Sequence, residues 1–109
     1  MDQLRAFLKE RAESAGVTAE VYIELPPADS MVYPCIVISR DVGRTKFADN
    51  GPYRHTPRYL LKGISQDVDS PLYGFLASLP TSIHNRSYPA DNLNHDVFTI
   101  SFQEEQNEA

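Results

Sequence analysis

Acidic and histidine side chains near the end of the chain are the residues best placed to do chemistry. In the run Asp91-Asn92-Leu93-Asn94-His95-Asp96, carboxylates flank an imidazole that they could orient for acid–base work. Asn and Asp also stabilise tight turns by hydrogen-bonding to their own backbone. Because the run is rich in these two residue types, we interpret Asp91, Asn92, Leu93, Asn94 and His95 as a structural turn.

The remaining reactive groups are scattered along the chain. His55 and His84 lack a second ligand at the close spacing that zinc sites show. Cys35 is the only cysteine, which excludes an intrachain disulfide, and its place in the apolar run from Tyr33 to Ile38 predicts a buried thiol. The sequence also lacks the motifs of phosphate-binding loops, dinucleotide sites and serine or zinc hydrolases. We therefore expect no enzyme, no cofactor and no metal site.

Basic residues gather in the middle of an acidic chain. The 109 residues carry a net charge of −5. Residues 1–39 hold three cations and six anions, residues 40–62 six cations and two anions, and residues 63–109 one cation and seven anions. The cations of the middle block are Arg40, Arg44, Lys46, Arg54, Arg58 and Lys62. The net charge thus divides into −3, +4 and −6, and the middle block is basic.

Three interpretations of the basic block stay open. Its charges could keep an exposed sheet edge from aggregating. Alternatively, the basic segment of one subunit could lie on the acidic body of the next, a head-to-tail contact that closes into a ring when the rotation per subunit closes. A third interpretation places the segment against the phosphate backbone of nucleic acid, although Phe47 and Tyr53 alone make a poor stacking platform and the overall acidic balance opposes such binding.

Apolar periodicity predicts two helices. The first contains apolar residues at helical spacing and ends near Gly16. The second runs from Pro71 to Leu79, with Asp69 or Ser70 as its N-cap. Gly74 lies inside that second helix, where it predicts the close approach of a neighbouring element. The apolar residues that set the spacing are Leu4, Phe7, Leu8, Ala12 and Ala15 in the first helix and Leu72, Phe75, Leu76 and Leu79 in the second.

Strand signals fill the rest of the chain. We predict strands at residues 21–23, 33–40, 83–88 and 97–103. A fifth strand, which ends near Ile64, is the return strand of a hairpin. Asn50-Gly51 predicts a two-residue hairpin turn that pairs Ala48 with Tyr53 and Arg44 with Pro57, which gives a long β-hairpin arm between about Tyr33 and Ile64. The tripeptide Ala-Asp-Asn at 48–50 recurs at 90–92, and we expect a turn at both places.

The predicted fold class is α+β. A mostly antiparallel sheet with two packed helices, in the order α-β-β-β-α-β-β, is the simplest architecture for these elements. Residues 1–103 form a single domain of this class, and residues 104–109 form an acidic C-terminal tail. The first residues lack a signal-peptide core, and no apolar run approaches the roughly 20 residues that span a bilayer. We therefore expect a soluble chain made inside the cell, with no membrane contact.

Several segments together resemble a known family. They resemble small tail proteins of long-tailed bacteriophages, called tail terminator, tail completion or head-to-tail joining proteins. The resemblance covers about Val21 to Phe102, and its most specific part is the run from Ala90 to Asp96. The segments are Tyr33-Pro34 at the start of a strand, Ala48-Asp49-Asn50 followed by Tyr53, Tyr59-Leu60-Leu61, the turn from Ser65 to Ser70, and the run from Tyr88 to Phe98.

The resemblance implies a structural role in a virion. Such proteins are small α+β subunits that form a homohexameric ring, stop polymerisation of the tail tube and offer a surface to the head connector. The implied partners are further copies of the chain, the tail tube protein, a head-proximal connector protein and, in passing, DNA in the lumen. The implied location is the head–tail junction of the virion, after assembly in the host cytoplasm, and the resemblance assigns no catalytic residue.

On this basis we expect the basic hairpin to contact a neighbouring subunit or an adjoining ring. The first alternative is a head-proximal connector, stopper or neck protein of the same virion. The second is a small nucleic-acid-binding module that uses the basic hairpin. The predicted interface residues are Arg44, Lys46, Phe47, Tyr53, Arg54 and Arg58.

Overall fold

The computed structural model describes residues 2–24, 31–40, 57–67 and 69–102. This part of the chain forms two helices and a five-stranded, mostly antiparallel sheet, so the α+β class and the predicted element order are confirmed. In chain order the elements are α1 (Asp2–Ser14), β1 (Glu20–Ile23), β2 (Cys35–Arg40), β3 (Arg58–Ser65), α2 (Leu72–Ala77), β4 (Ile83–Ala90) and β5 (Leu93–Ser101). Neither of the described helices is long and apolar enough to cross a membrane.

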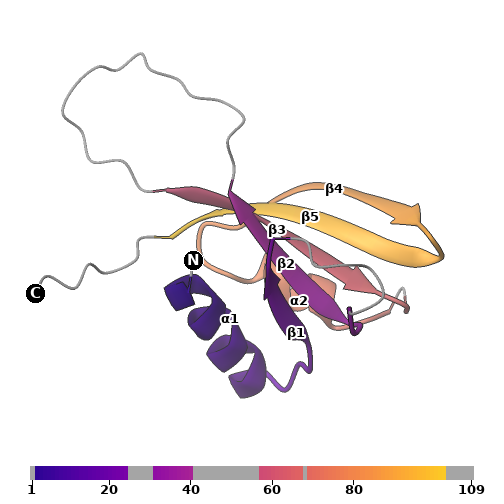
Figure 1. Ribbon diagram of the computed structural model, residues 1–109, viewed down its shortest axis with the longest axis horizontal. Coiled ribbons are helices and arrows are strands. Elements are labelled where there is room, and N and C mark those ends of the chain that lie inside the picture. The colour runs from indigo at the N-terminus through magenta and orange to yellow at the C-terminus, as the bar shows by residue number, and fades with distance from the viewer. Residues whose placement is uncertain (1, 25–30, 41–56, 68, 103–109) are drawn as a thin grey trace, which may run out of the picture.

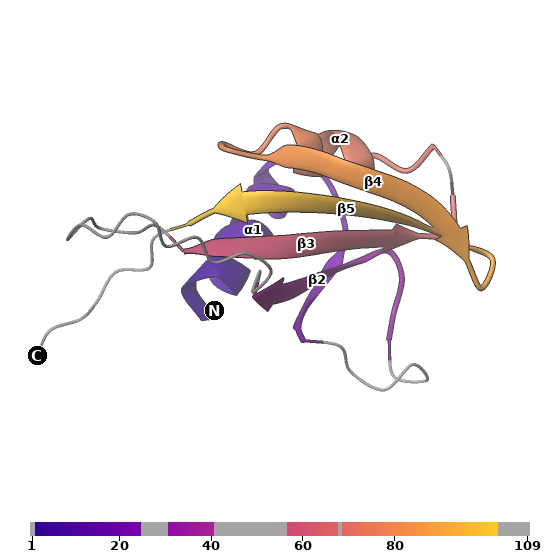
Figure 2. The same cartoon turned by 90° about the horizontal axis from the view of Figure 1, so that it is seen from above.

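The sheet has the strand order β1-β2-β3-β5-β4 (Figures 1 and 2). Strand β1 pairs with β2 in parallel, and the other three pairs are antiparallel. Strand β3 therefore lies at the centre, with the hairpin of β4 and β5 on one side and β2 on the other. Every residue of β4 from Ile83 to Ser87 is exposed, which confirms the predicted polar edge strand.

Helix α1 forms where the sequence predicts it. Leu4, Leu8 and Ala12 recur on one side of the helix and are buried. Gly16 adopts a left-handed backbone with φ of 76°, and the Val17 N–H donates to the Ala12 carbonyl at 2.8 Å. This bond closes the helix end in the way that a glycine after the last turn allows.

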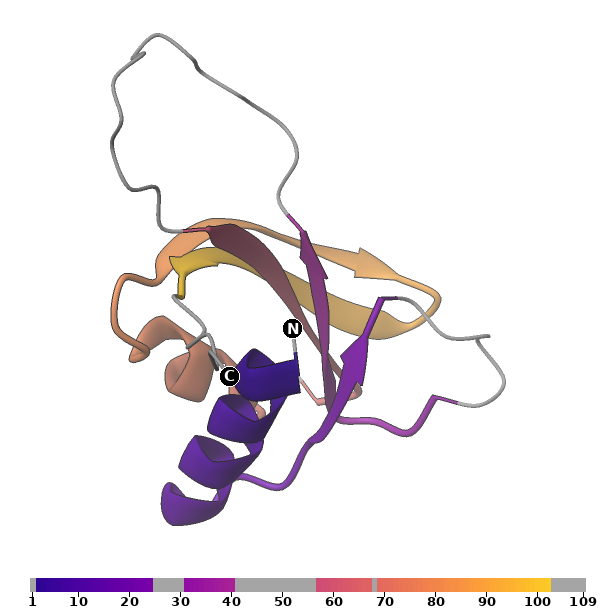
Figure 3. The same cartoon turned by 60° about the vertical axis from the view of Figure 1, so that its left-hand side comes forward.

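Both helices pack on the same face of the sheet (Figures 1 and 3). Their apolar residues meet Leu61 and Phe98, which are fully buried at the centre of the main core. Gly63 makes room for α2, because a Cβ atom there would lie 2.7 Å from Leu76 Cδ1. Our prediction for Gly74 is wrong: a Cβ atom built at Gly74 has nothing within 4 Å, and the close approach occurs at Gly63.

A smaller apolar cluster lies on the opposite face of the sheet. It consists of the buried residues Cys35, Val37 and Ile64, and four partly buried side chains pack against it. Strand β2 is thus covered on both faces, as its unbroken apolar run predicts. The four covering residues are Tyr22, Met31, Tyr33 and Leu93.

Several predicted boundaries need correction, and three of them change by two residues or more at an end that matters for packing. Strand β2 begins at Cys35, because Tyr33-Pro34, joined by a cis peptide, precedes the sheet. Helix α2 ends at Ala77, although the apolar spacing continues to Leu79, which is still buried. Strand β5 begins at Leu93, four residues earlier than predicted, because the preceding turn is shorter than we expected.

The base of the predicted hairpin arm is present. Strands β2 and β3 are antiparallel neighbours, and Arg40 lies opposite Tyr59. An unbroken ladder in the predicted register would place Val42 opposite Tyr59, so the observed register differs by two residues. The buried pair Ile38 and Leu61 sets the observed register. The predicted pairs around Asn50-Gly51 lie outside the described residues.

Candidate functional site

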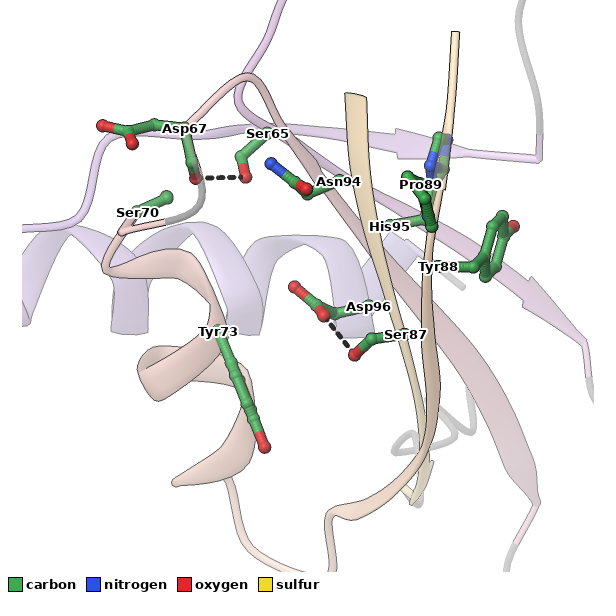
Figure 4. Close-up of a pocket in the computed structure, with 10 residues that line it drawn as sticks. All are labelled: Ser65, Asp67, Ser70, Tyr73, Ser87, Tyr88, Pro89, Asn94, His95 and Asp96. Atoms are coloured by element: carbon green, nitrogen blue, oxygen red, sulfur yellow. Dashed lines mark hydrogen bonds between the residues drawn. The ribbon is translucent and has the colours of Figure 1, made fainter. Parts of the chain in front are cut away.

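A cavity of about 330 Å³ lies between the loop that leads into α2 and the β4–β5 hairpin (Figure 4). Its walls come from three places: the end of β3 with the following loop, the start of α2, and the facing parts of β4 and β5. Most of its polar groups are hydroxyls and carboxylates. The lining residues are Ser65, Asp67, Ser70, Tyr73, Ser87, Tyr88, Pro89, Asn94, His95 and Asp96.

A two-residue turn positions one wall of the cavity. Asp91 and Asn92 both adopt positive φ, of 54° and 65°, and Ala90 pairs directly with Leu93. Asp and Asn tolerate this left-handed backbone, which suits the turns that join two-residue hairpins. The turn predicted at Ala90-Asp91-Asn92 is confirmed, whereas the matching turn at residues 48–50 lies outside the described residues.

The predicted structural turn from Asp91 to His95 is too long. Leu93, Asn94 and His95 belong to β5. Because the turn uses only two residues, the hairpin register places Ser87 opposite Asp96 and Tyr88 opposite His95. Sequence reasoning missed this arrangement, although the Asp-Asn pair was a signal for a two-residue turn.

Three polar side chains on β4 and β5 form a hydrogen-bonded chain. The Ser87 hydroxyl donates to Asp96 Oδ1 at 2.5 Å, and His84 Nε2 lies 2.8 Å from Ser87 Oγ. A serine hydroxyl has one hydrogen to donate, so the imidazole donates to Ser87. In a serine hydrolase the imidazole instead accepts the serine proton. The chain therefore fixes the direction of the Asp96 carboxylate and does not activate Ser87 as a nucleophile.

Aromatic rings hold this wall against α2. The Tyr73 ring lies 5.5 Å from that of Phe98 and 5.3 Å from that of His84, and the rings of His84 and Phe98 are 5.0 Å apart. Phe98 is fully buried, whereas Tyr73 is 39% exposed. Because the Phe98 ring is anchored in the core, the Tyr73 ring that packs on it presents a fixed aromatic surface at the cavity.

The loop before α2 is tied down by its own polar groups. The Ser65 hydroxyl donates to the Asp67 carbonyl, and the Asp69 N–H donates to Asp67 Oδ1, both at 3.1 Å. The Leu72 N–H donates to Ser70 Oγ at 3.1 Å, so Ser70 makes the bond predicted of an N-cap, although regular helix begins at Leu72. The loop is a defined wall of the cavity.

His95 is not oriented by the neighbouring carboxylates. Adjacent residues of a strand point to opposite faces, and His95 stacks on Tyr88, with centroids 4.8 Å apart and an interplanar angle of 4°. Its Nδ1 atom is buried and has no hydrogen-bond partner in the described structure. Burial lowers the pKa of His95, and Lys62 lowers it further, against weaker opposing effects of Asp96 and Asp91. The imidazole is therefore mainly a packing group.

The Cys35 thiol is buried, as its sequence context predicts. Burial raises its pKa to about 11, and the nearby Glu20 carboxylate contributes in the same direction. A thiol that stays protonated is a poor nucleophile. Within the described residues, no group of three or more His, Cys, Asp or Glu side chains could hold a metal ion.

The electrostatic character of the cavity follows from its lining. Asp67 and Asp96 contribute carboxylates, and no Lys or Arg of the described residues lines the cavity. Figure 4 shows the Asp67 carboxylate directed away from the other lining side chains and Asp96 beside Ser87. Such a cavity suits a cation or a group rich in hydrogen-bond donors.

The predicted interface residues are mostly not described. Arg44, Lys46, Phe47, Tyr53 and Arg54 lie outside the described ranges, as does His55. Arg58 is exposed and begins β3, where it lies opposite Ser101. The cavity lies at the other end of the same strand, where Ser65 pairs with Asn94. The structure therefore does not bring Arg58 and the Asp91–His95 run together.

Comparison with known proteins adds no relative. No protein-family model matches the chain, and no match was found among curated proteins or solved structures.

Proposed function

We propose that this chain is a structural, non-catalytic subunit of a bacteriophage virion: a tail terminator that forms a ring, caps the tail tube and joins it to the head connector. The sequence resemblance between Val21 and Phe102 suggests this role. The structural observation that carries the proposal is the way in which the basic segment is attached to the fold.

Strand β2 ends beside the start of β3, with Arg40 opposite Tyr59. Arg58, the first residue of β3, lies opposite Ser101. The chain between them adds Arg44, Lys46 and Arg54 to these two arginines. Both attachment points are exposed. A basic segment held at one end of a sheet, on an otherwise acidic body, favours contact with another molecule that carries negative charge.

A second copy of the chain is the simplest such molecule. Its residues 63–109 carry seven acids against Arg86 alone. Contact between two different surfaces of identical subunits is heterologous, and it closes into a ring when the rotation per subunit allows. Small α+β subunits with an exposed edge strand suit this kind of repeated contact.

The proposal is tested by reversing charge in the basic segment. Arg54→Glu combined with Arg58→Glu should abolish ring formation, and native mass spectrometry would then detect single chains of 12.3 kDa instead of a hexamer. The same variant should fail to join tails assembled without this chain to filled heads. Arg5→Glu with Lys9→Glu, two exposed positions on α1, is the matched control and should assemble and join normally.

Unchanged assembly and joining in the Arg54/Arg58 variant would contradict the proposal. Electron microscopy of labelled virions then distinguishes a terminator from a connector or stopper, because the label lies on the tail side of the junction or on the head side. If the chain instead binds duplex DNA as a single copy, with an affinity that falls steeply with salt, it is a nucleic-acid-binding module.

A further inference from the structure

We propose that the cavity between α2 and the β4–β5 hairpin receives a lysine or arginine side chain from the basic segment, residues 40–58, of a second copy. Copies of the chain would then join head to tail. This inference rests on the proposed ring-forming function and specifies the acceptor surface, which the charge distribution of the sequence does not identify.

The Asp96 carboxylate is the main argument. The Asp96 side chain is partly exposed, and within the described structure its carboxylate accepts a solvent-exposed hydrogen bond from the Ser87 hydroxyl. That hydroxyl, itself held by His84, is neutral and leaves the negative charge of Asp96 uncompensated. A carboxylate forms a stronger hydrogen bond with a cationic donor than with a neutral hydroxyl, and a guanidinium offers two parallel N–H donors.

Two cations of the chain's own sheet lie away from Asp96. Lys62 and Arg86 lie on the opposite face of the sheet, where both line a separate cavity with Glu24 and Val97. The Arg86 guanidinium lies over the Tyr88 ring, 5.2 Å from its centroid. Neither residue lines the cavity that contains Asp96, so a cation that enters this cavity would come from another part of the sequence.

The volume and lining of the cavity admit one long side chain. Its volume of about 330 Å³ is at the lower end of the range of about 300–1,000 Å³ typical of pockets for small ligands. Tyr73 supplies a partly exposed ring held by Phe98, against which a cation can pack. Asp67 adds a second carboxylate to the lining.

The positions of donor and acceptor favour a contact between copies. The basic segment joins the sheet beside Arg58, whereas the cavity adjoins Ser65. These residues are the two ends of β3, about 23 Å apart at 3.3 Å per residue. The basic segment joins the sheet at one end of β3 and the cavity lies at the other, which favours a heterologous contact, the kind that closes rings.

The first test removes the acceptor charge with little change of shape. Asp96→Asn should raise the subunit dissociation constant of the ring about tenfold, measured by sedimentation velocity, and should flatten its dependence on salt. Glu10→Gln, an exposed charge on α1, is the matched control and should leave both quantities unchanged. Circular dichroism confirms that each variant is folded.

The second test exchanges the two charges between copies. Asp96→Arg alone should not assemble, and neither should the triple variant Arg44→Glu, Lys46→Glu, Arg54→Glu. Mixed one to one, they should form rings, because each basic segment then meets an acidic cavity and each acidic segment meets a basic one. This rescue requires folded partners, so it also excludes misfolding as the cause of the separate failures.

The outcomes separate this inference from the function on which it rests. A wild-type ring with unchanged assembly of Asp96→Asn, or with no rescue in the mixture, overturns the cavity as acceptor and leaves the ring-forming function intact. A wild-type chain that stays single at all concentrations and does not join tails overturns both. A loss of thermal stability in Asp96→Asn without any effect on the ring means that Asp96 acts only within its own chain, through Ser87 or through that chain's own basic segment, which also overturns the inference.

Discussion

Replacing Gly63 by alanine should destabilise the fold, although alanine is usually the more stabilising residue. The new Cβ atom would lie 2.7 Å from Leu76 Cδ1 and 3.2 Å from Leu72 Cδ2. Leu76 is fully buried and Leu72 is 3% exposed, so neither side chain can swing into solvent. The helix, or the strand beneath it, must shift.

The size of the effect follows from two opposing contributions. Forcing an extra methyl group into a packed core costs about 1–3 kcal/mol. Restricting the unfolded chain by replacing glycine with alanine returns about 0.4–1 kcal/mol. We therefore expect Gly63→Ala to lower the free energy of unfolding by about 1–2 kcal/mol, measured by urea denaturation at one fixed protein concentration.

Gly74→Ala is the matched control, because nothing lies within 4 Å of a Cβ atom built there. At this position in α2 alanine should raise stability by roughly 0.5–1 kcal/mol. Leu76→Ala alone should cost about 2–5 kcal/mol, and adding Gly63→Ala to it should cost about 1 kcal/mol less than the separate effects predict. Equal effects at both glycines, or strict additivity with Leu76→Ala, would refute the close contact between α2 and β3.

Three further predictions concern single residues. Because burial lowers the pKa of His95 below 6.5, the unfolded state binds the proton more tightly; stability should be complete above pH 6.5 and fall as the pH drops below it. His95→Phe should show a smaller fall between pH 7.5 and 5.5, and equal falls would contradict the assignment. Alkylation of Cys35 at pH 8 should be at least about 100-fold slower in the native state than in urea, because a pKa of about 11 leaves little thiolate; comparable rates would show an accessible thiol. Gly16→Ala should cost about 1 kcal/mol of stability in thermal unfolding, since its φ of 76° strains any residue with a Cβ atom, and an unchanged melting temperature would argue against that backbone.

Local signals predicted the elements well where burial and backbone chemistry agree. The spacing of Leu4, Leu8 and Ala12 predicts α1, and Gly16 ends it as expected. The continuous apolar run in β2 predicts a strand covered on both faces. Boundaries were less predictable: the apolar spacing of α2 reaches Leu79, but Pro80 ends regular helix early, since the residue before a proline disfavours helical backbone.

Glycine shows why packing is harder to predict than secondary structure. Gly74 interrupts a helical pattern and so attracts a packing explanation, yet its surroundings are open. Gly63 lies in a strand pattern, which gives no sign of a close approach, and α2 packs directly against it. The difference depends on which strand meets the helix, and a single sequence does not contain that pairing.

The candidate cavity could not be predicted for a related reason, which is register. Read as a five-residue turn, the run from Asp91 to His95 keeps Ser87 and Asp96 apart, because the strands pair only beyond it. A two-residue turn at Asp91-Asn92 brings Ser87 opposite Asp96 and moves His95 to the other face of the sheet. The length of one turn therefore decides which acid faces α2 and which ring stacks on Tyr88, so the chemistry of this region depends on the backbone conformation of two residues.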